Sequence, residues 1–543
     1  MTPLLNRIKV ILSDKHTSIV IIALAIVVRV IQLIFFYNIR VDGMYQVMAM
    51  QNFVDGHGIS IGKVLPTDLS TIVYEPLINW PPGYSLLLSP FYILFGHDYI
   101  AAGIALDILS AIILILTCRS ILKTLNTPAY LVNLFTLLTG FFIYYFYFIN
   151  SSDAIAIAFL LLAVHFTLLL LNKKAFSLKL TLGISTCLFL CGLIKYLFIP
   201  VVFVIPLFLL FKGMADKNRA IKAGGTLSFT ILLVLLGAVL AWQKINSGSI
   251  GYISESTRGF FPENLLETYP ALPASFISPD TISLAFPSGS EVMTIIFRIL
   301  QCLHVLLFLA VAVYILKKII NQGFKKLTAQ DSFFYLSFFL SAGITLVLII
   351  LSMTVGKEEN IPGSWWTYVE EPRYYGLIHV LVHLGVFLLY QYYRARDSKR
   401  LKYLLIILIL LLLPETFRGI LFTARRVMNA ENEEYSWHAE KDVQLFARSV
   451  IQKEKGEKEN VIVTGSSYYM YYRVGMYNHV PALTDAASVN DLTKLNTKKS
   501  ILLLVLLQEE DAKQYESFRM NPETQFAGEM QGVYFYTVHV KPR

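Results

Sequence analysis

Four ionisable residues lie at the ends of long apolar segments, where charge is costly and usually has a function. Asp42 follows the first apolar segment, Asp153 begins the fourth, and Lys195 lies in a short turn between two more. Arg373 begins a later segment within the sequence VEEPRYYGLIHV. An acid beside a nucleophile can act as a general base, while Lys and Arg neutralise phosphate oxygens. The four residues therefore suit a reaction in which an acceptor loses a proton and an anionic group leaves.

Each of these residues also has a structural interpretation, which the sequence leaves open. Asp153 follows Asn150-Ser151-Ser152 and could simply cap a helix. Lys195 and Arg373 could extend their side chains to the membrane interface. Asp42 has no obvious capping role. Arg29 and Asp107 differ from these four, because they lie at matched depths in consecutive apolar segments and are best explained as a structural pair.

The composition indicates a membrane protein. The chain has 543 residues, of which 55% are hydrophobic and 15% charged, with a mean hydropathy of +0.58. The net charge is +9, but the basic residues form no aromatic-interleaved polar segment, so we expect no nucleic-acid partner. All four cysteines lie within or beside apolar segments, which argues against disulfides and thiolate metal sites.

About eleven membrane-spanning helices are predicted from apolar runs of suitable length. The expected spans are 17–37, 99–118, 128–149, 153–171, 180–194, 196–211, 225–243, 294–316, 332–354, 374–392 and 403–422. With this count, every basic cluster between spans falls on the side of the N-terminus. The positive-inside rule therefore predicts a cytoplasmic N-terminus in a multi-pass membrane protein. The membrane that we expect is the bacterial inner membrane.

The opposite, external side carries the large loops. We expect residues 1–424 to form a transmembrane module with external loops at 38–98 and 244–293. The apolar run Leu86–Phe95 is too short to span and predicts a helix in the membrane interface. Residues 425–543 are expected to form a small external, periplasmic α/β domain, with strands near 461–464, 501–507 and 533–540 and helices between them. The fold class expected is thus a polytopic α-helical membrane protein with a small C-terminal α/β domain.

The first loop resembles a known pattern. The sequences RVDGMYQVMAMQNFVDGHG at 40–58 and YEPLINWPPGYSLLLSPFYILFG at 74–96 resemble the first external loop of GT-C fold glycosyltransferases. By pattern they are most similar to the aminoarabinose transferases of lipid A and the protein O-mannosyltransferases. The sequence EPRYY at 371–375 resembles the entry into a late helix of these enzymes.

The resemblance implies transfer of a sugar from a polyprenyl-phosphate donor to a lipid, glycan or protein acceptor of the cell envelope, with inversion at the anomeric carbon. Asp42 would orient or deprotonate the acceptor, and Asp153 would be a second acid. The donor phosphate would be held by Arg373, Lys195 and Arg258. The residues expected to line the substrate cavity are Tyr45, Tyr74, Glu75 and Tyr374.

Two departures from the pattern bear on the substrate and on metal binding. Glu75 is followed by Pro76, where the aminoarabinose transferases have lysine, and the loop 244–293 lacks the histidine that partners this glutamate on a metal. These differences argue against aminoarabinose activity and leave the sugar open. No cofactor is required; a divalent cation is left open, with Glu75 as a weak candidate ligand.

Two other functions compete with glycosyl transfer. A lipid-linked oligosaccharide transporter or flippase would explain the many helices, but it predicts small loops and internal pseudo-symmetry. An O-antigen polymerase or ligase would also have large external loops, but would depend on loop arginines and histidines rather than on an acid beside the first span.

Overall fold

The computed structural model divides into two compact units. The helical unit comprises Met1–Ile34, Ala105–Tyr147 and Ser152–Val427, and the sheet unit comprises Phe35–Ile104, Phe148–Ser151 and Met428–Arg543. The structure describes the whole chain except residues 1, 36–38, 40, 143–150, 174, 249–258, 287–289, 326, 355–371, 395–398, 430–435, 458, 510–513 and 543.

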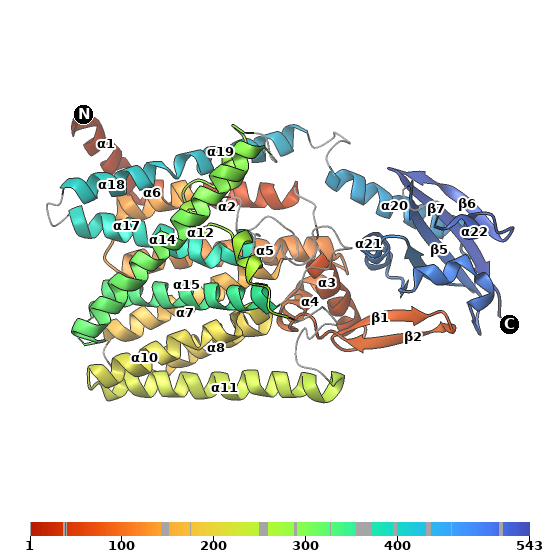
Figure 1. Ribbon diagram of the computed structural model, residues 1–543, viewed down its shortest axis with the longest axis horizontal. Coiled ribbons are helices and arrows are strands. Elements are labelled where there is room, and N and C mark those ends of the chain that lie inside the picture. The colour runs from red at the N-terminus through yellow and green to blue at the C-terminus, as the bar shows by residue number, and fades with distance from the viewer. Residues whose placement is uncertain are drawn as a thin grey trace. The chain divides into compact units, whose positions relative to one another are not determined.

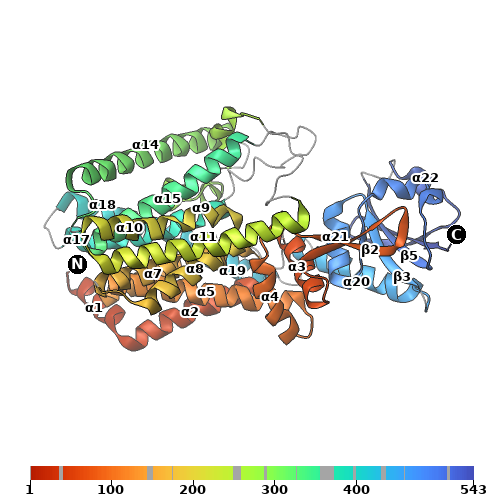
Figure 2. The ribbon, with the colours of Figure 1, turned by 90° about the horizontal axis from the view of Figure 1, so that it is seen from below.

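The helical unit is built of helices alone in its described residues (Figures 1 and 2). Its long helices are α2 (Lys15–Ile34), α5 (Tyr99–Thr124), α7 (Ser152–Lys173), α8 (Leu178–Ile194), α10 (Val204–Ala215), α11 (Arg219–Ser247), α14 (Glu291–Gln322), α15 (Ala329–Thr354), α17 (Gly376–Arg394), α18 (Lys399–Leu410) and α19 (Leu413–Met428). Shorter helices are α1 (Thr2–Ser13), α6 (Ala129–Thr139), η1 (Tyr196–Phe198), α9 (Ile199–Val202), η2 (Pro262–Glu267), α12 (Ala271–Ala274), α13 (Pro279–Ile282) and η3 (Pro372–Tyr375).

Among the described residues, nine helical stretches are long and apolar enough to cross a membrane, which confirms the predicted fold class of a multi-pass membrane protein. They correspond to nine of the eleven expected spans, with α18 and α19 together forming the last. The expected span at 180–194 is α8, which has 17 residues. The span expected at 128–149 begins with α6, which has 11 residues, and its part from 143 onward lies outside the described residues.

Glycines let neighbouring helices of this unit approach closely. A Cβ atom on Gly213 of α10 would lie 2.4 Å from the backbone nitrogen of Lys222 in α11. A Cβ atom on Gly225 of α11 would lie 2.6 Å from the backbone nitrogen of Leu210. Small residues at such crossings are typical of membrane helices, where close packing replaces the hydrophobic effect as the source of association. The pair α10–α11 therefore depends on these two glycines.

The sheet unit combines the first large loop with the C-terminal residues. Its elements are α3 (Val41–Val54), β1 (Ser60–Leu65), β2 (Asp68–Pro76), α4 (Gly83–Leu94), α20 (Ser436–Glu454), β3 (Asn460–Gly465), α21 (Tyr468–Asn478), β4 (Ala482–Leu483), η4 (Ala486–Asn490), η5 (Leu492–Lys494), β5 (Ile501–Gln508), α22 (Glu516–Arg519), β6 (Thr524–Met530) and β7 (Val533–Val540). The helix expected at Leu86–Phe95 is present as α4, and the three expected strands are β3, β5 and β7.

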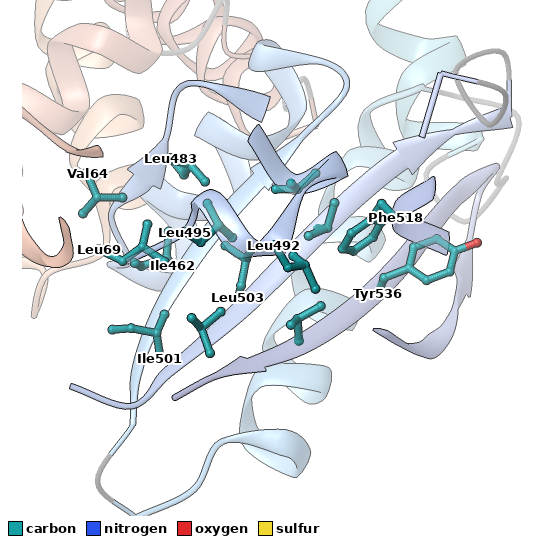
Figure 3. Close-up of a cluster of buried hydrophobic side chains, with 14 of the residues drawn as sticks. Val64, Leu69, Ile462, Leu483, Leu492, Leu495, Ile501, Leu503, Phe518 and Tyr536 are labelled. Atoms are coloured by element: carbon teal, nitrogen blue, oxygen red, sulfur yellow. The ribbon is translucent and has the colours of Figure 1, made fainter. Parts of the chain in front are cut away.

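Seven strands form one mixed sheet in the order β2-β1-β4-β3-β5-β7-β6. The strands β1, β4, β3 and β5 run parallel to their neighbours in this series, while β2, β7 and β6 pair antiparallel. The central strand β5 is buried from Ile501 to Leu507, as its unbroken apolar sequence requires. Figure 3 shows the cluster that this strand forms with Leu69, Ile462 and Phe518.

The loop strands β1 and β2 belong to the same sheet as the C-terminal strands. Val64 of β1 pairs with Leu483 of β4, and Val64 and Leu69 are buried in the shared core. The boundary expected at 424/425 thus differs from the division into units, which groups Phe35–Ile104 with the C-terminal residues. The physical reason is that the hairpin buries apolar side chains in a core made mostly by strands more than 380 residues further along.

Candidate functional site: a buried carboxylate between two cations

Asp153 is buried at the start of α7. Asp153 is only 2% exposed. Burial of an ionised carboxylate is costly, because the group loses much of its hydration. The helix begins at Ser152, so Asp153 is the second helical residue, and its carboxylate interacts with Lys195 and Arg373. These two cations compensate the buried negative charge of Asp153, which a capping role alone would leave unexplained.

Lys195 lies where the chain changes direction between α8 and η1. Its backbone is extended, with φ −147° and ψ 120°, and this break in the helix directs the side chain to Asp153. The Lys195 Nζ forms an ion pair with Asp153 Oδ1, and the lysine side chain is only 12% exposed. The short turn expected at Lys195 thus holds a cation that is nearly buried.

Arg373 and Tyr374 complete the cluster from η3. Arg373 Nη1 lies 3.6 Å from Asp153 Oδ2, and Arg373 Nη2 donates a hydrogen bond of 3.0 Å to the Tyr374 hydroxyl. The Tyr374 ring centroid lies 4.7 Å from Lys195 Nζ and 4.8 Å from Arg373 Cζ. One ring therefore contacts both cations, and cation–π attraction stabilises them close together.

The cluster joins residues that the sequence separates by more than 200 positions. Two of its three charged side chains are positive, and both contact the carboxylate of Asp153, which is buried. Such a pair of cations can bind an anionic oxygen group: Arg offers a planar fork of donors and Lys a compact charge. The arrangement is suited to stabilising a phosphate, including one that gains charge as a bond to it breaks.

Further side chains support this cluster, and sequence reasoning missed them. Gln243 of α11 donates a hydrogen bond to the hydroxyl of Tyr196, the residue after Lys195. The rings of Tyr269 and Tyr375 lie 5.4 Å apart. Hydrophobic periodicity does not reveal such contacts, because they join apolar segments with no fixed spacing.

Asp42, Tyr45, Tyr74 and Glu75 lie in the sheet unit. Asp42 is in the first turn of α3 and is partly exposed. The Tyr45 ring stacks on Trp80 with centroids 4.7 Å apart, and lies 5.4 Å from the ring of Tyr472. Burial raises the pKa of Tyr472, so its hydroxyl stays protonated at neutral pH. An aromatic group therefore adjoins the face of α3 that carries Asp42.

Tyr74 and Glu75 have partners within the loop hairpin. The Tyr74 ring stacks on His57 with centroids 3.9 Å apart. Glu75 Oε1 lies 2.5 Å from Lys63 Nζ, across the antiparallel pair β1–β2. Burial, followed by the charge of Asp55, raises the pKa of Tyr74. Arg258, expected to contact phosphate, lies outside the described residues.

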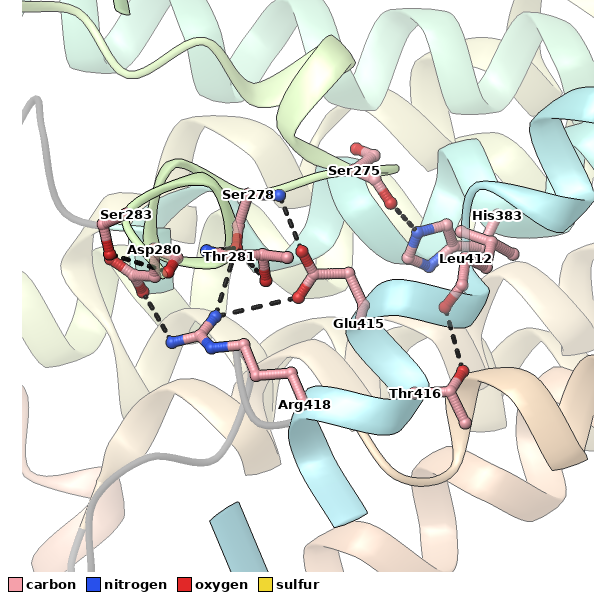
Figure 4. A network of polar contacts seen from close by, with 10 residues as sticks. All are labelled: Ser275, Ser278, Asp280, Thr281, Ser283, His383, Leu412, Glu415, Thr416 and Arg418. Carbon is pink, nitrogen blue, oxygen red and sulfur yellow. Dashed lines mark hydrogen bonds and ion pairs between the residues drawn. The ribbon is translucent and has the colours of Figure 1, made fainter. Parts of the chain in front are cut away.

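A second polar network connects the segment 275–283 to residues of α17 and α19 (Figure 4). The buried Glu415 of α19 accepts a hydrogen bond of 2.7 Å from the Ser278 backbone N–H. Arg418 lies 3.7 Å from Glu415 and 3.2 Å from Asp280. Two histidines also contact the segment 269–283: His304 Nδ1 accepts from the Leu272 N–H, and His383 Nε2 lies 2.5 Å from the Ser275 carbonyl oxygen.

Arg29 and Asp107, the expected pair, are both buried in the helical unit. Arg29 Nη1 donates to Gln32 Oε1 at 2.7 Å, and Gln32 Nε2 donates to Thr423 Oγ1 at 2.9 Å. Arg29 also lines a pocket with Thr136. These contacts support the structural interpretation of Arg29.

The residues that the structure describes do not fit a metal site. They contain no group of three His, Cys, Asp or Glu side chains that could hold an ion. Glu75, the weak candidate ligand, is paired with Lys63. We therefore derive no step through a metal.

Comparison with known proteins bears on the fold. Neither the protein-family models nor the curated sequences gave a match. The chain is similar in structure to ArnT from Cupriavidus metallidurans bound to undecaprenyl phosphate, with a TM-score of 0.52, 11% identity, and coverage of 96% of this chain and 97% of that one.

Two further similar structures have lower scores. The oligosaccharyltransferase of Archaeoglobus fulgidus in complex with Zn and sulfate has a TM-score of 0.44 and 12% identity, covering 92% of this chain and 69% of that one. The mycobacterial arabinofuranosyltransferase AftD has a TM-score of 0.46 and 9% identity, covering 96% of this chain and 40% of that one. The resemblance expected from the first loop is confirmed at the level of fold: the chain has the GT-C fold of membrane glycosyltransferases.

Proposed function

We propose that the protein transfers a sugar from a polyprenyl-phosphate donor to an acceptor on the external face of the membrane. The observation that carries this proposal is the convergence of Lys195 and Arg373 on Asp153, with Tyr374 against both cations. The GT-C fold supports it, and the ArnT structure with the similar fold is bound to undecaprenyl phosphate.

In this reaction an acceptor oxygen attacks the anomeric carbon of the donor sugar. Asp42 accepts the proton of the attacking hydroxyl, and the bond between the anomeric carbon and the phosphate oxygen breaks. The electron pair of that bond leaves with the polyprenyl phosphate, whose extra negative charge is stabilised by Lys195 and Arg373. A single displacement of this kind inverts the anomeric carbon.

Asp153 has a second role in the proposal. Its carboxylate holds the two cations in position before the donor arrives, so that they need not reorganise when the phosphate binds. Arg258 remains a proposed third phosphate contact. Tyr45, Tyr74, Glu75 and Tyr374 remain proposed residues of the substrate cavity, and the acceptor is a component of the cell envelope.

The proposed topology places the N-terminus in the cytoplasm and the sheet unit outside. The basic residues between spans support this orientation by the positive-inside rule. Fusions of an enzyme that is active only in the periplasm test it: a fusion after residue 543 is expected to be active and one after Lys318 inactive. The reverse pattern would overturn the orientation.

The catalytic proposal is tested in membranes supplied with radiolabelled polyprenyl-phosphate sugars. Wild type is expected to transfer label, and Asp42→Asn to reduce transfer by about 100-fold or more, since general base catalysis contributes factors of this size. Lys195→Met is expected to weaken binding of the donor, so that a higher donor concentration is needed for the same rate of transfer. Lys212→Met is a matched control, because Lys212 is also nearly buried and paired with an aspartate, Asp216. Undiminished transfer by Asp42→Asn would exclude Asp42 as the base.

A further inference from the structure

Gln46 in α3 has a buried side-chain amide. The residue is 1% exposed, and within the described part of the chain neither its side-chain oxygen nor its side-chain nitrogen has a hydrogen-bond partner. Its backbone carbonyl is used, since it accepts a hydrogen bond of 2.7 Å from Ser85 Oγ. A buried amide with both of its polar atoms unsatisfied is destabilising, and such groups in folded proteins require an explanation.

A second glutamine in the same helix shows that the local structure can satisfy such a group. Gln51 is also buried, at 5% exposed. Its Nε2 donates to the Met476 carbonyl at 3.1 Å and lies 3.3 Å from His479 Nε2. Gln46 and Gln51 are thus the same residue type, lie in the same helix and are both buried, but among the described residues only the Gln51 amide has hydrogen-bond partners.

Gln46 shares a helix face with the proposed base. Asp42, Tyr45 and Gln46 are spaced i, i+3 and i+4, and residues at these spacings are neighbours on a helix surface. A carboxylate, an aromatic ring stacked on Trp80 and an unsatisfied amide thus lie on one face of α3.

We propose that Gln46 binds the acceptor and that the acceptor is a sugar ring with neighbouring hydroxyl groups; this inference rests on the proposed function. The amide offers one acceptor and one donor side by side, and each hydroxyl of a vicinal pair can both donate and accept. When one hydroxyl gives its proton to Asp42, the neighbouring hydroxyls bond to the Gln46 oxygen and nitrogen. The Tyr45–Trp80 pair borders the C–H surface of the same ring.

The stability of two matched variants separates this role from that of an ordinary core residue. Gln46→Met replaces an unsatisfied amide by an apolar side chain of similar length, so it is expected to raise the unfolding temperature of the full-length protein in detergent by about 2 to 4 °C. Gln51→Met removes satisfied hydrogen bonds and is expected to lower it by a similar amount. A fall in the Gln46→Met variant would show that the amide is satisfied in the protein and would overturn the proposal.

Acceptor use is then measured with a panel of methyl pyranosides as probes. Donor lipid can be consumed by transfer to a pyranoside or by hydrolysis, and Gln46 is proposed to act only on the first. Gln46→Met removes both proposed hydrogen bonds and is expected to reduce transfer to the pyranosides at least about tenfold, a factor that corresponds to about 1.4 kcal/mol. Hydrolysis of the donor, in which no sugar acceptor takes part, is expected to change less than transfer. Equal ratios of transfer to hydrolysis in wild type and Gln46→Met would overturn the proposal.

A binding measurement keeps this test separate from the proposed function. If wild type consumes no polyprenyl-phosphate sugar, the proposed function has failed, but the pyranosides can still be tested as ligands. A rise in the unfolding temperature of wild type with a pyranoside, absent in Gln46→Met, supports acceptor binding at Gln46. If no pyranoside of the panel stabilises wild type or accepts sugar from it, or if a peptide with Ser and Thr does so instead, the assignment of a sugar acceptor is wrong.

Discussion

The Tyr374 ring centroid lies 4.7 Å from the Lys195 ammonium, which is itself paired with Asp153. The same ring lies 4.8 Å from the Arg373 guanidinium. Two like charges repel each other, and here the attraction of each cation to one carboxylate and one aromatic ring offsets that repulsion. The pair of cations is therefore maintained by contacts from α7 and η3, independently of any bound phosphate.

The first prediction concerns Tyr374, which is buried and has a separable ring and hydroxyl. Tyr374→Phe removes the acceptor for Arg373 Nη2 and is expected to lower stability by about 1 kcal/mol. Tyr374→Leu also removes the cation–π contacts and is expected to cost about 2 to 3 kcal/mol in total. Unfolding measured with and without undecaprenyl phosphate tests both effects, with the larger loss of lipid binding expected for Tyr374→Leu. Equal effects of the two variants would show that the ring does not stabilise the cations.

A second prediction compares the two ion-pair partners of Arg418. The Glu415 side chain is 3% exposed, whereas that of Asp280 is 59% exposed. Arg418→Met leaves a buried carboxylate without its cation and is expected to cost about 3 to 5 kcal/mol of unfolding free energy. Asp280→Asn is expected to change it by at most about 0.5 kcal/mol. Chemical denaturation measures both. Glu415→Gln combined with Arg418→Met should recover part of the loss; no recovery would contradict a buried-charge origin.

Much of the helical unit could be predicted from the sequence, since lipid-facing and packed helices require long apolar runs. The runs at 153–171 and 225–243 are present as parts of α7 and α11. Strand β5 was predictable for the related reason that a fully buried strand is a short unbroken apolar run. Asp153, Lys195 and Arg373 could be selected as charges at the ends of apolar segments, but their mutual contact depends on how distant helices pack.

Other features left little or no local signal. The alternating residues of β1 and β2 are typical of a hairpin, but nothing in them specifies pairing with β4, which follows more than 400 residues later. Strand β6 contains few apolar residues because it lies at the edge of the sheet. Gln46 and Gln51 are indistinguishable in the sequence, and only the packed structure shows that the Gln51 amide has partners while the described residues offer none to the Gln46 amide.

A third prediction concerns pH and His479, which ends α21. His479 Nε2 lies 2.9 Å from the Tyr92 hydroxyl and 3.3 Å from the Gln51 amide nitrogen, so it serves as an acceptor and must be unprotonated. Burial, the largest cause, lowers the pKa of His479 below 6.5; the charge of Asp55 opposes this shift, and His97 and Arg448 make smaller contributions in the same direction as burial. The unfolded chain then binds more protons than the folded one, so this contribution to stability is present above pH 6.5 and is lost as pH falls below it.

His479→Asn is the matched variant for this prediction. The backbone at this position has φ +54°, in the left-handed region that asparagine tolerates, and asparagine does not titrate. Thermal unfolding from pH 8 to pH 5 should show a steeper loss of stability in wild type than in His479→Asn, by at most about 1.4 kcal/mol per pH unit. Parallel pH profiles would mean that His479 does not gain a proton on unfolding.

The last prediction tests whether the loop hairpin belongs to the C-terminal sheet. Leu69 of β2 is 2% exposed in the core cluster, and its N–H donates to the Asn496 carbonyl at 2.8 Å. Leu69→Ala is expected to destabilise the sheet unit by about 2 to 5 kcal/mol, whereas Val73→Ala in the same strand, where Val73 is 36% exposed, should cost much less. Hydrogen exchange of the amides of β5 measures the effect, because the core strands exchange by opening of the whole unit. Faster exchange in β5 after Leu69→Ala, and in a fragment of residues 425–543 that lacks the hairpin, is the expected result. Unchanged exchange in that fragment would show that the C-terminal residues form a complete domain by themselves.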